Sequence, residues 1–278
     1  MKTLNDDQIN DILKKYHFYH IIKLTENIST YGLNKPQVNK NLNLINKINF
    51  KNKKVLDVGC RDGIYSFEAE KLGATEIIAI DNDLSKGATE FLIPFFKSKV
   101  QMYQKNLFDL KVSDHGKFDV IIFPGVLYHL RYPMYALKIL SDLLNENGIL
   151  LIETSILLED KNRAILFCPI NDDSPYDSTS CTFFNQKGLT DTLKSFGLTV
   201  YDIRLSSKRS FIKNVFKKFL RIFSDEFFGK KLTSVCRGTF LCEKKFSSIS
   251  KIDSMYWNSS HNLHSALGNH ITRTKKRS

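Results

Sequence analysis

Short apolar runs alternate with longer, mixed segments through the middle of the chain. The runs at 55–58, 77–80, 119–123 and 149–152 have the length of strands. Runs that are apolar at every position are typical of parallel strands buried on both faces, and the segments between them are long enough for covering helices. The pattern therefore predicts an α/β fold with a Rossmann-like, mostly parallel sheet and helices on both faces. The predicted helices span 64–72, 85–97, 133–146 and 186–196.

Weaker strand signals occur near 100–103 and at 198–205 and 238–243. The segment before the sheet, residues 1–48, begins with a predicted helix at 4–16 and continues with aromatic residues. We predict that it forms a leader outside the sheet. Its histidines, His17 and His20, either pack among the aromatic side chains or line a pocket.

The segment between the last two predicted strands has a different pattern. From 208 to 231, apolar residues recur at helical spacing with lysine and arginine between them, which predicts a basic amphipathic helix inserted in the domain. Its apolar face is expected either to pack on the sheet or a partner subunit, or to act as a substrate lid or a peripheral membrane contact. Residues 246–278 are polar and basic and are predicted to form a flexible tail. The predicted domain therefore spans 49–245.

Composition and charge narrow the class of protein. A chain of 278 residues with 42% hydrophobic content can bury a full core. The net charge of +12 arises after residue 207, which favours an anionic partner such as RNA, a membrane surface or an acidic glycan, or else a solvated basic surface. The five cysteines are scattered, so we predict neither a disulfide framework nor a metal site. Without a signal-peptide pattern or an apolar spanning segment, the expected location is cytoplasmic.

The candidate chemistry begins where the strand 55–58 ends. Gly59 and Gly63 flank a turn into the next predicted helix, whose first backbone N–H groups would face a ligand. A dinucleotide-binding fingerprint has glycines at relative positions 0, 2 and 5. Here Arg61 stands at the middle position and Gly63 comes one residue early. The spacing therefore favours the S-adenosylmethionine site of class I methyltransferases.

Polar residues follow the next strands at the same edge. Asp81 ends the second strand and is predicted to accept both ribose hydroxyls, each through a charge-assisted hydrogen bond of roughly 1.5–3 kcal/mol, or else to serve as a turn acid. Asp57 would lie beside the methionyl amino group or orient the turn. Asn106 would offer its amide oxygen to the adenine, with a turn role as the alternative. The predicted cofactor-binding residues are Asp57, Gly59, Cys60, Arg61, Gly63, Asp81, Asn82, Asn106, Leu107, Gly125 and Val126.

The loop after the fourth strand carries the candidate catalytic residues. It starts at the carboxyl edge of the sheet, where ligands bind in open α/β folds. His129 is the predicted general base for a hydroxyl acceptor, a role that contributes roughly 10²–10⁴ in rate, and Tyr128 is predicted to shape the site. Arg131 is predicted to hold an anionic acceptor. The alternative for His129 is a buried histidine that is hydrogen-bonded to the backbone. The alternative for Arg131 is a surface salt bridge.

The run Gly125-Val126-Leu127-Tyr128-His129, its spacing to Pro133, and Leu151-Ile152-Glu153-Thr154 resemble the tRNA wobble-uridine carboxymethyltransferase family and its methyltransferase relatives. The resemblance spans roughly residues 50–200. It implies a seven-stranded sheet whose last two strands pair antiparallel at one edge. It also implies S-adenosylmethionine or its carboxylated form as donor, with Arg131 as a residue that would hold the extra carboxylate. Leu130 stands where the family has a further arginine, so the first interpretation is ordinary methyl transfer.

Three functions are compatible with these observations. The first is methyl transfer to an oxygen or nitrogen of a small-molecule or glycan acceptor. The second is a tRNA-modifying carboxymethyltransferase whose basic C-terminal region contacts phosphate. The third is a non-catalytic nucleoside-binding or membrane-associated protein. The sequence indicates neither the acceptor nor the oligomeric state.

Overall fold

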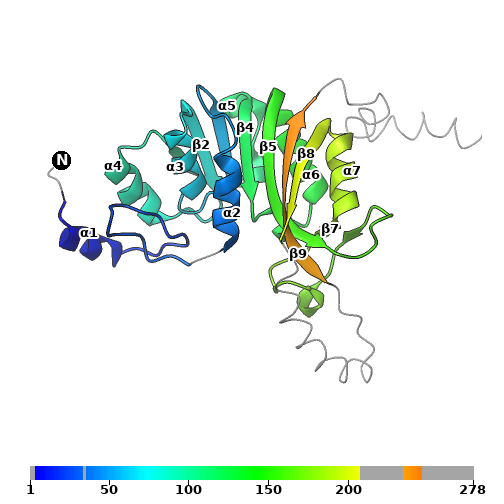
Figure 1. Ribbon diagram of the computed structural model, residues 1–278, viewed down its shortest axis with the longest axis horizontal. Coiled ribbons are helices and arrows are strands. Elements are labelled where there is room, and N and C mark those ends of the chain that lie inside the picture. The colour runs from blue at the N-terminus through cyan, green and yellow to red at the C-terminus, as the bar shows by residue number, and fades with distance from the viewer. Residues whose placement is uncertain (1–3, 34–35, 207–233, 246–278) are drawn as a thin grey trace, which may run out of the picture.

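A single mixed sheet forms the centre of the protein (Figure 1). The computed structural model describes residues 4–33, 36–206 and 234–245. Within them the sheet has nine strands in the order β3-β2-β1-β4-β5-β7-β6, and β9 pairs with both β5 and β8. The amphipathic insertion predicted at 208–231 and the tail predicted at 246–278 lie outside the described residues, so the domain boundaries stay a prediction.

The central strands pair in parallel, as predicted, from β3 through β2, β1 and β4 to β5. The last two strands pair antiparallel with each other, and β9 also pairs antiparallel with β5. These pairings confirm the predicted α/β sheet with an antiparallel edge. The strands concerned are β1 (Lys54–Val58), β2 (Glu76–Asp81), β3 (Gln101–Gln104), β4 (Phe118–Pro124), β5 (Leu144–Leu157), β8 (Leu198–Leu205) and β9 (Val235–Lys244).

Two short strands raise the number from the seven expected to nine. They are β6 (Leu166–Phe167) and β7 (Phe183–Asn185). The pairing of β4 with β5 ends at Glu153, and β5 continues to Leu157, where β7 takes the place of β4 beside it. Strands of two or three residues are too short to give a periodic signal in the sequence, so neither was predicted.

The helices agree with the predicted segments, with local differences. The helix predicted at 133–146 ends at Leu143 because β5 begins at the next residue. The segment predicted at 85–97 begins with a π-helical turn, in which the Ile93 N–H bonds to the Ala88 carbonyl, before α4. Helix α2 was not predicted. The helices are α1 (Asp6–Leu13), α2 (Pro36–Ile45), α3 (Ile64–Lys71), α4 (Ile93–Phe96), α5 (Val112–His115), α6 (Pro133–Leu143) and α7 (Gln186–Ser195).

Each face of the sheet has its own hydrophobic core. One core packs α6 and α7 on the sheet through residues such as Leu140 and Leu189. The other packs α2 and α3 through residues such as Ile45 and Ala69. Among the described residues, no helix combines the length and the apolarity that a membrane span requires.

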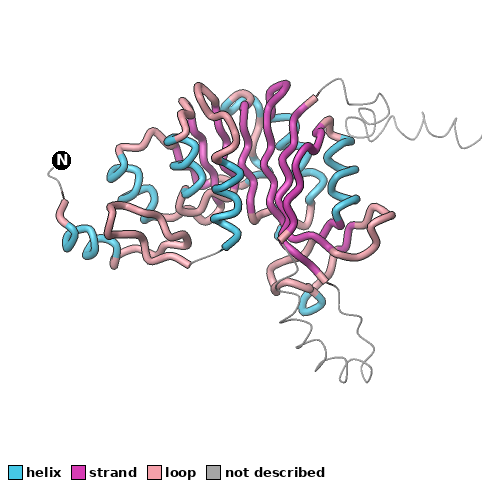
Figure 2. Tube along the Cα trace, in the orientation of Figure 1, coloured by secondary structure: helices cyan, strands magenta, loops and turns pink. Residues whose placement is uncertain are grey.

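The leader forms a third, smaller core beside the sheet. Its Leu13 and Phe18 pack with Phe91 and Leu92 from the π-helical turn. Figure 2 shows that the part of the leader between α1 and α2 is a long loop beside the helices at this end of the sheet. The described part of the leader thus forms none of the strands of the sheet and is packed against the domain.

Candidate functional site

A cleft of about 560 Å³ opens at the carboxyl edge of the parallel strands. It is formed by the turn after β1, the ends of β2 and β4, the loop after β3, the leader, α2 and β9. The structure brings ten of the predicted site residues together along its wall. They are Gly59, Arg61, Asp81, Asn82, Asn106, Leu107, Gly125, Val126, Tyr128 and His129.

The turn after β1 requires glycine at two positions. Gly59 and Gly63 have φ of +77° and +80°, a backbone conformation that glycine adopts without strain. A Cβ at Gly59 would lie 2.3 Å from Val126 Cγ2, and a Cβ at Gly63 would lie 2.2 Å from Met102 Cε. The two glycines therefore allow the turn to approach the loop after β4 and strand β3 closely. Gly63 itself and Cys60 lie behind the lining of the cleft.

Asp81 holds the turn together from the end of β2. Its Oδ2 accepts a hydrogen bond from the Arg61 N–H at 2.9 Å, and its Oδ1 accepts one from the Asp83 N–H at 2.8 Å. An ionised carboxylate offers about four acceptor positions, so two remain for a ligand that lies in the cleft. Asp81 can therefore serve as the predicted hydroxyl acceptor and as a turn acid at once.

Asp57 lies beneath the cleft and is fully buried. Its Oδ2 accepts a hydrogen bond from Ser66 Oγ at 2.6 Å, whereas its Oδ1 has no partner among the described residues. Burial raises the pKa of Asp57 to about 7. A buried carboxyl group with one unpartnered oxygen favours a cationic partner, because a positive charge would offset its desolvation.

Asn106 caps the short 3₁₀ turn Leu107–Asp109. Its Oδ1 accepts a hydrogen bond from the Phe108 N–H at 3.0 Å. The turn role that the sequence left open for Asn106 is thus present. The amide oxygen is engaged in the turn, and the side chain also lines the cleft beside Leu107.

The loop after β4 forms the opposite wall with Tyr128 and His129. Tyr128 is buried, and burial raises its pKa to about 12 although the nearby Arg237 opposes the shift. Its hydroxyl therefore stays protonated near neutral pH and can donate a hydrogen bond. His129 is exposed to the cleft, and its Nδ1 lies 3.2 Å from the Thr179 carbonyl oxygen.

Arg237 is the main residue of this wall that the sequence analysis missed. It comes from β9, and its guanidinium forms a two-point ion pair with the buried Glu153 on β5. Its Cζ lies 4.5 Å from the centre of the Tyr128 ring. A signal was present, because Glu153 is a lone charge within an apolar strand and a buried charge requires a partner. The sequence did not give the register of β9 that identifies this partner.

Arg131 is not among the residues that line the cleft, and its role toward an anionic ligand stays a prediction. Its Nη2 donates to the Pro169 carbonyl at 3.0 Å, and its Nη1 donates to the Cys181 carbonyl at 3.3 Å. Among the described residues, its partners are thus backbone carbonyls and not the acid of the alternative salt bridge. The guanidinium instead fixes the loop between β6 and β7, because backbone carbonyls of that loop are its nearest acceptors.

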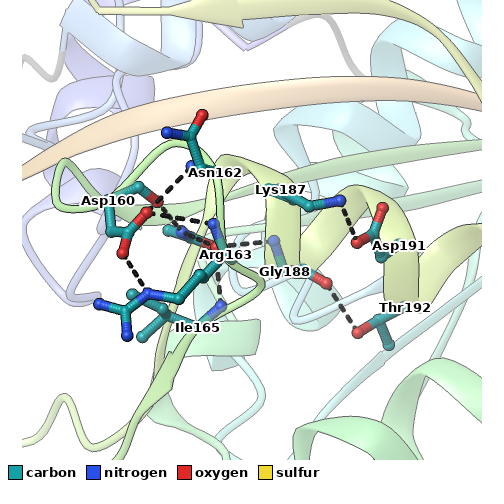
Figure 3. Close-up of polar contacts among 9 residues, drawn as sticks. Asp160, Asn162, Arg163, Ile165, Lys187, Gly188, Asp191 and Thr192 are labelled. Atoms are coloured by element: carbon teal, nitrogen blue, oxygen red, sulfur yellow. Dashed lines mark hydrogen bonds and ion pairs between the residues drawn. The ribbon is translucent and has the colours of Figure 1, made fainter.

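The segment between β5 and β6 is anchored at the start of α7 (Figure 3). Asn185 Oδ1 accepts from the Gly188 N–H at 2.7 Å, and its Nδ2 donates to the Arg163 carbonyl at 2.7 Å. The Arg163 side chain pairs with Asp160 and is mostly exposed. Arg163 therefore shapes the segment that follows β5 and does not line the cleft.

The leader is fixed to the turn after β1 by Asp62. Its Oδ2 accepts hydrogen bonds from the backbone N–H groups of Tyr19 and His20 at 2.6 and 2.7 Å. His20 is buried and lines the cleft, whereas the exposed His17 does not. The position of His20 therefore agrees with the alternative interpretation, in which this histidine lines a pocket. Within the described residues, no group of three or more histidine, cysteine, aspartate or glutamate side chains could hold a metal ion.

Sequence comparison relates the chain to methyltransferases. A family model described as a methyltransferase domain matches residues 33–203. The tRNA U34 carboxymethyltransferase of Helicobacter pylori (strain Shi470) is 39% identical over 122 residues, which are 43% of this chain and 46% of that protein. The tRNA U34 carboxymethyltransferase of Nautilia profundicola is 36% identical over 124 residues, which are 44% of this chain and 40% of that protein. The chain thus spans about half the length of the curated relatives it matches.

Solved structures share the fold. The N-terminal domain of EvdMO1, crystallised in the presence of SAH and D-fucose, has a TM-score of 0.61 at 14% identity, over 87% of this chain and 98% of that chain. The Burkholderia thailandensis 1,6-didemethyltoxoflavin-N1-methyltransferase, with 1,6-didemethyltoxoflavin and S-adenosylhomocysteine bound, has a TM-score of 0.54 at 14% identity, over 76% of this chain and 80% of that chain. At these identities the likeness shows the fold alone.

Proposed function

The chain belongs to the methyltransferase-domain family, and from this premise we propose that it transfers a methyl group from S-adenosylmethionine to an oxygen or nitrogen of a small-molecule acceptor. One observation carries the proposal. Asp57 near the end of β1, Asp81 at the end of β2 and Asn106 after β3 come from three adjacent parallel strands, and Asp81 and Asn106 line one cleft while Asp57 lies buried beneath it. Together they offer partners for the ammonium, ribose and adenine groups of one extended ligand.

The unpartnered oxygen of Asp57 tests the fit of this donor. Among the described residues, the Oδ1 of its fully buried carboxyl has no partner, and the methionyl ammonium of the donor would supply one. Asp81 keeps acceptor positions for two neighbouring hydroxyls. Gly59 lines the cleft, and its missing side chain leaves the space that Val126 fills beside it. These features fit S-adenosylmethionine, and the donor when bound supplies an electrophilic methyl group.

The opposite wall would hold the acceptor. Methyl transfer is an in-line displacement, so the main contribution of the protein is alignment, which can supply up to about 7–11 kcal/mol in well-oriented reactions. His129 is the proposed base for an acceptor that loses a proton, and Tyr128 remains a hydrogen-bond donor. Membership of the methyltransferase-domain family supports an enzyme over the hypothesis of a non-catalytic nucleoside-binding or membrane-associated protein.

Calorimetric titration of the protein with S-adenosylmethionine and S-adenosylhomocysteine tests the donor site. We expect both to bind with one site per chain, because the ammonium, ribose and adenine groups are the same in the two ligands. Nicotinamide adenine dinucleotide is the control ligand, and we expect no binding because the turn after β1 lacks the middle glycine. Failure of both S-adenosyl ligands to bind would overturn the proposal.

The affinity for the donor is expected to depend on the ionisation of Asp57. Its pKa is raised to about 7, and a bound ammonium stabilises only the carboxylate form. Binding at pH 7 should therefore release about half a proton per chain, and the affinity should fall about fivefold from pH 7 to pH 6. Titration in two buffers of different ionisation enthalpy measures this proton. The Asp57→Asn variant should bind more weakly and without this proton release, and an unchanged proton release would exclude Asp57 as its source.

A second candidate function is transfer from the carboxylated donor to tRNA. The names of the sequence relatives support it, as does the cationic Arg237 that lies against Tyr128 in the cleft. The ion pair with Glu153 already offsets the charge of Arg237, which favours the ordinary donor. A preference for carboxy-S-adenosylmethionine over S-adenosylmethionine in the same titration, lost in the Arg237→Lys variant, would favour this second function. Binding to tRNA that weakens steeply with salt would support the RNA acceptor.

A further inference from the structure

Thr179 lies next to His129 in the cleft wall because two chain segments run side by side. The Cys181 and Thr182 N–H groups both donate to the Tyr128 carbonyl, at 2.9 and 3.2 Å. Thr182 Oγ1 also donates to the Leu130 carbonyl at 2.7 Å. These hydrogen bonds hold the segment that contains Thr179 along the loop after β4. The contact between Thr179 and His129 is therefore built into the fold of this wall.

The Nδ1 atom of His129 lies next to two oxygens of Thr179. The carbonyl oxygen and Oγ1 of Thr179 are both 3.2 Å from Nδ1. The carbonyl oxygen can only accept a hydrogen bond. The hydroxyl could donate or accept, so its direction decides whether both contacts require a proton on Nδ1.

Asp177 fixes the direction of that hydroxyl. Thr179 Oγ1 donates to Asp177 Oδ1 at 2.9 Å, and the same carboxylate oxygen accepts from the Thr179 N–H at 3.0 Å and from Ser180 Oγ at 2.6 Å. Burial raises the pKa of Asp177, but the hydrogen bonds donated by Ser180 and Thr179 outweigh it and hold this pKa below its ordinary value. Asp177 is therefore a carboxylate at neutral pH and accepts the Thr179 hydroxyl proton, which leaves an Oγ1 lone pair for His129.

We propose that Asp177 and Thr179 are positioning residues that hold neutral His129 with its proton on Nδ1 and leave Nε2 as a proton acceptor in the cleft. Both neighbours of Nδ1 are then acceptors, so the other tautomer would place lone pairs against lone pairs. Which ring nitrogen of a histidine carries the proton is set by the partner of the other one. Neither Asp177 nor Thr179 was singled out in the sequence.

This inference rests on the proposed function and narrows its acceptor to a group that must lose a proton, such as a hydroxyl. As the acceptor oxygen bonds to the methyl carbon, the carbon–sulfur bond breaks and its electron pair stays on sulfur. The proton of the acceptor hydroxyl passes to Nε2, which forms the imidazolium. The Thr179 hydroxyl donates to the Asp177 carboxylate, which polarises Oγ1, and Oγ1 in turn accepts the Nδ1 proton and stabilises that imidazolium.

Long-range ¹H–¹⁵N NMR spectra of the ¹⁵N-labelled protein test the proposal without an acceptor. Spectra are recorded at a pH where His129 is neutral, and its signals are identified by their loss in His129→Asn. We expect a single tautomer protonated on Nδ1. In Asp177→Ala the Thr179 hydroxyl is free to donate to Nδ1, so we expect loss of the single tautomer and appearance of the Nε2-protonated form. Ser180→Ala, which removes another partner of Asp177, is the matched control and should keep the wild-type tautomer.

A wild-type His129 protonated mainly on Nε2 would overturn the proposal, and so would an unchanged tautomer in Asp177→Ala. If Asp177→Ala fails to fold, the His129 tautomer in the wild type and in Thr179→Val tests the proposal instead. Valine removes the hydroxyl and keeps the shape of the side chain. The donor titration is a separate measurement. Absent donor binding with the expected tautomer would reject the proposed function alone, whereas normal donor binding with the wrong tautomer would reject this inference alone.

Discussion

The Asp81→Ala variant is expected to bind S-adenosylmethionine about 10²- to 10⁴-fold more weakly than the wild type. Two hydrogen bonds from ribose hydroxyls to a carboxylate contribute roughly 1.5–3 kcal/mol each, and each 1.4 kcal/mol or so is a factor of about ten in affinity. The variant also loses the acceptors of the Arg61 and Asp83 N–H groups, so the turn after β1 becomes less ordered. Both effects act in the same direction.

Calorimetry with S-adenosylmethionine and S-adenosylhomocysteine measures this loss. Asp83→Ala is the matched control, because Asp83 is the neighbouring acid, is largely exposed and pairs with Arg61, and we expect its affinity to change little. Asp81→Asn separates the two effects, since an amide can still accept one of the backbone N–H groups but lacks the charge. Donor affinity equal to that of the wild type in Asp81→Ala would mean that the ribose is held elsewhere.

The Asp62→Ala variant is expected to lower the free energy of unfolding by roughly 2–6 kcal/mol. The substitution leaves the N–H groups of Tyr19 and His20 without their acceptor, and each unsatisfied buried group costs about 1–3 kcal/mol. Because this carboxylate is the link between the leader and the turn after β1, we also expect weaker donor binding. Chemical denaturation followed by circular dichroism measures the first effect, and calorimetry measures the second.

The effect of Asp62 should depend on pH. Burial raises its pKa, but hydrogen bonds from His20 and Ser85 outweigh burial and hold the folded-state pKa below the ordinary value. The contribution of Asp62 to the free energy of unfolding is therefore complete above the ordinary aspartate pKa and is lost as the pH falls through the folded-state pKa. The wild type and Asp62→Ala should thus become more alike in stability in acid. Asp62→Asn, which keeps an acceptor oxygen, should lie between them at neutral pH, and an Asp62→Ala variant as stable as the wild type would contradict the role of this residue.

Local signals predicted the sheet and many of the residues that line the cleft. Continuous apolar runs have the length of buried strands, and the spacing of Gly59 and Gly63 depends only on the turn that they form. Asp81 and Asn106 were found because the carboxyl ends of neighbouring parallel strands meet at one edge. These inferences need the order of the strands along the chain and no knowledge of long-range register.

The residues that were missed depend on contacts between distant segments. Arg237 pairs with Glu153 because of the register of β9 on β5. Asp62 accepts hydrogen bonds from leader residues that are more than forty positions away in the sequence. Thr179 contacts His129 because the segment before β7 lies along the loop after β4. Arg131 donates to backbone carbonyls, and residue type alone does not separate this use of an arginine from the binding of an anionic ligand.

The position of β9 has a consequence for biosynthesis. This strand fills the gap between β5 and β8 and is the last described strand to leave the ribosome. Until it emerges, the nascent chain exposes one edge of β5, and Glu153 lacks its counter-ion Arg237. Ribosome-bound chains that stop before β9 should therefore be prone to aggregate through the open edge of β5.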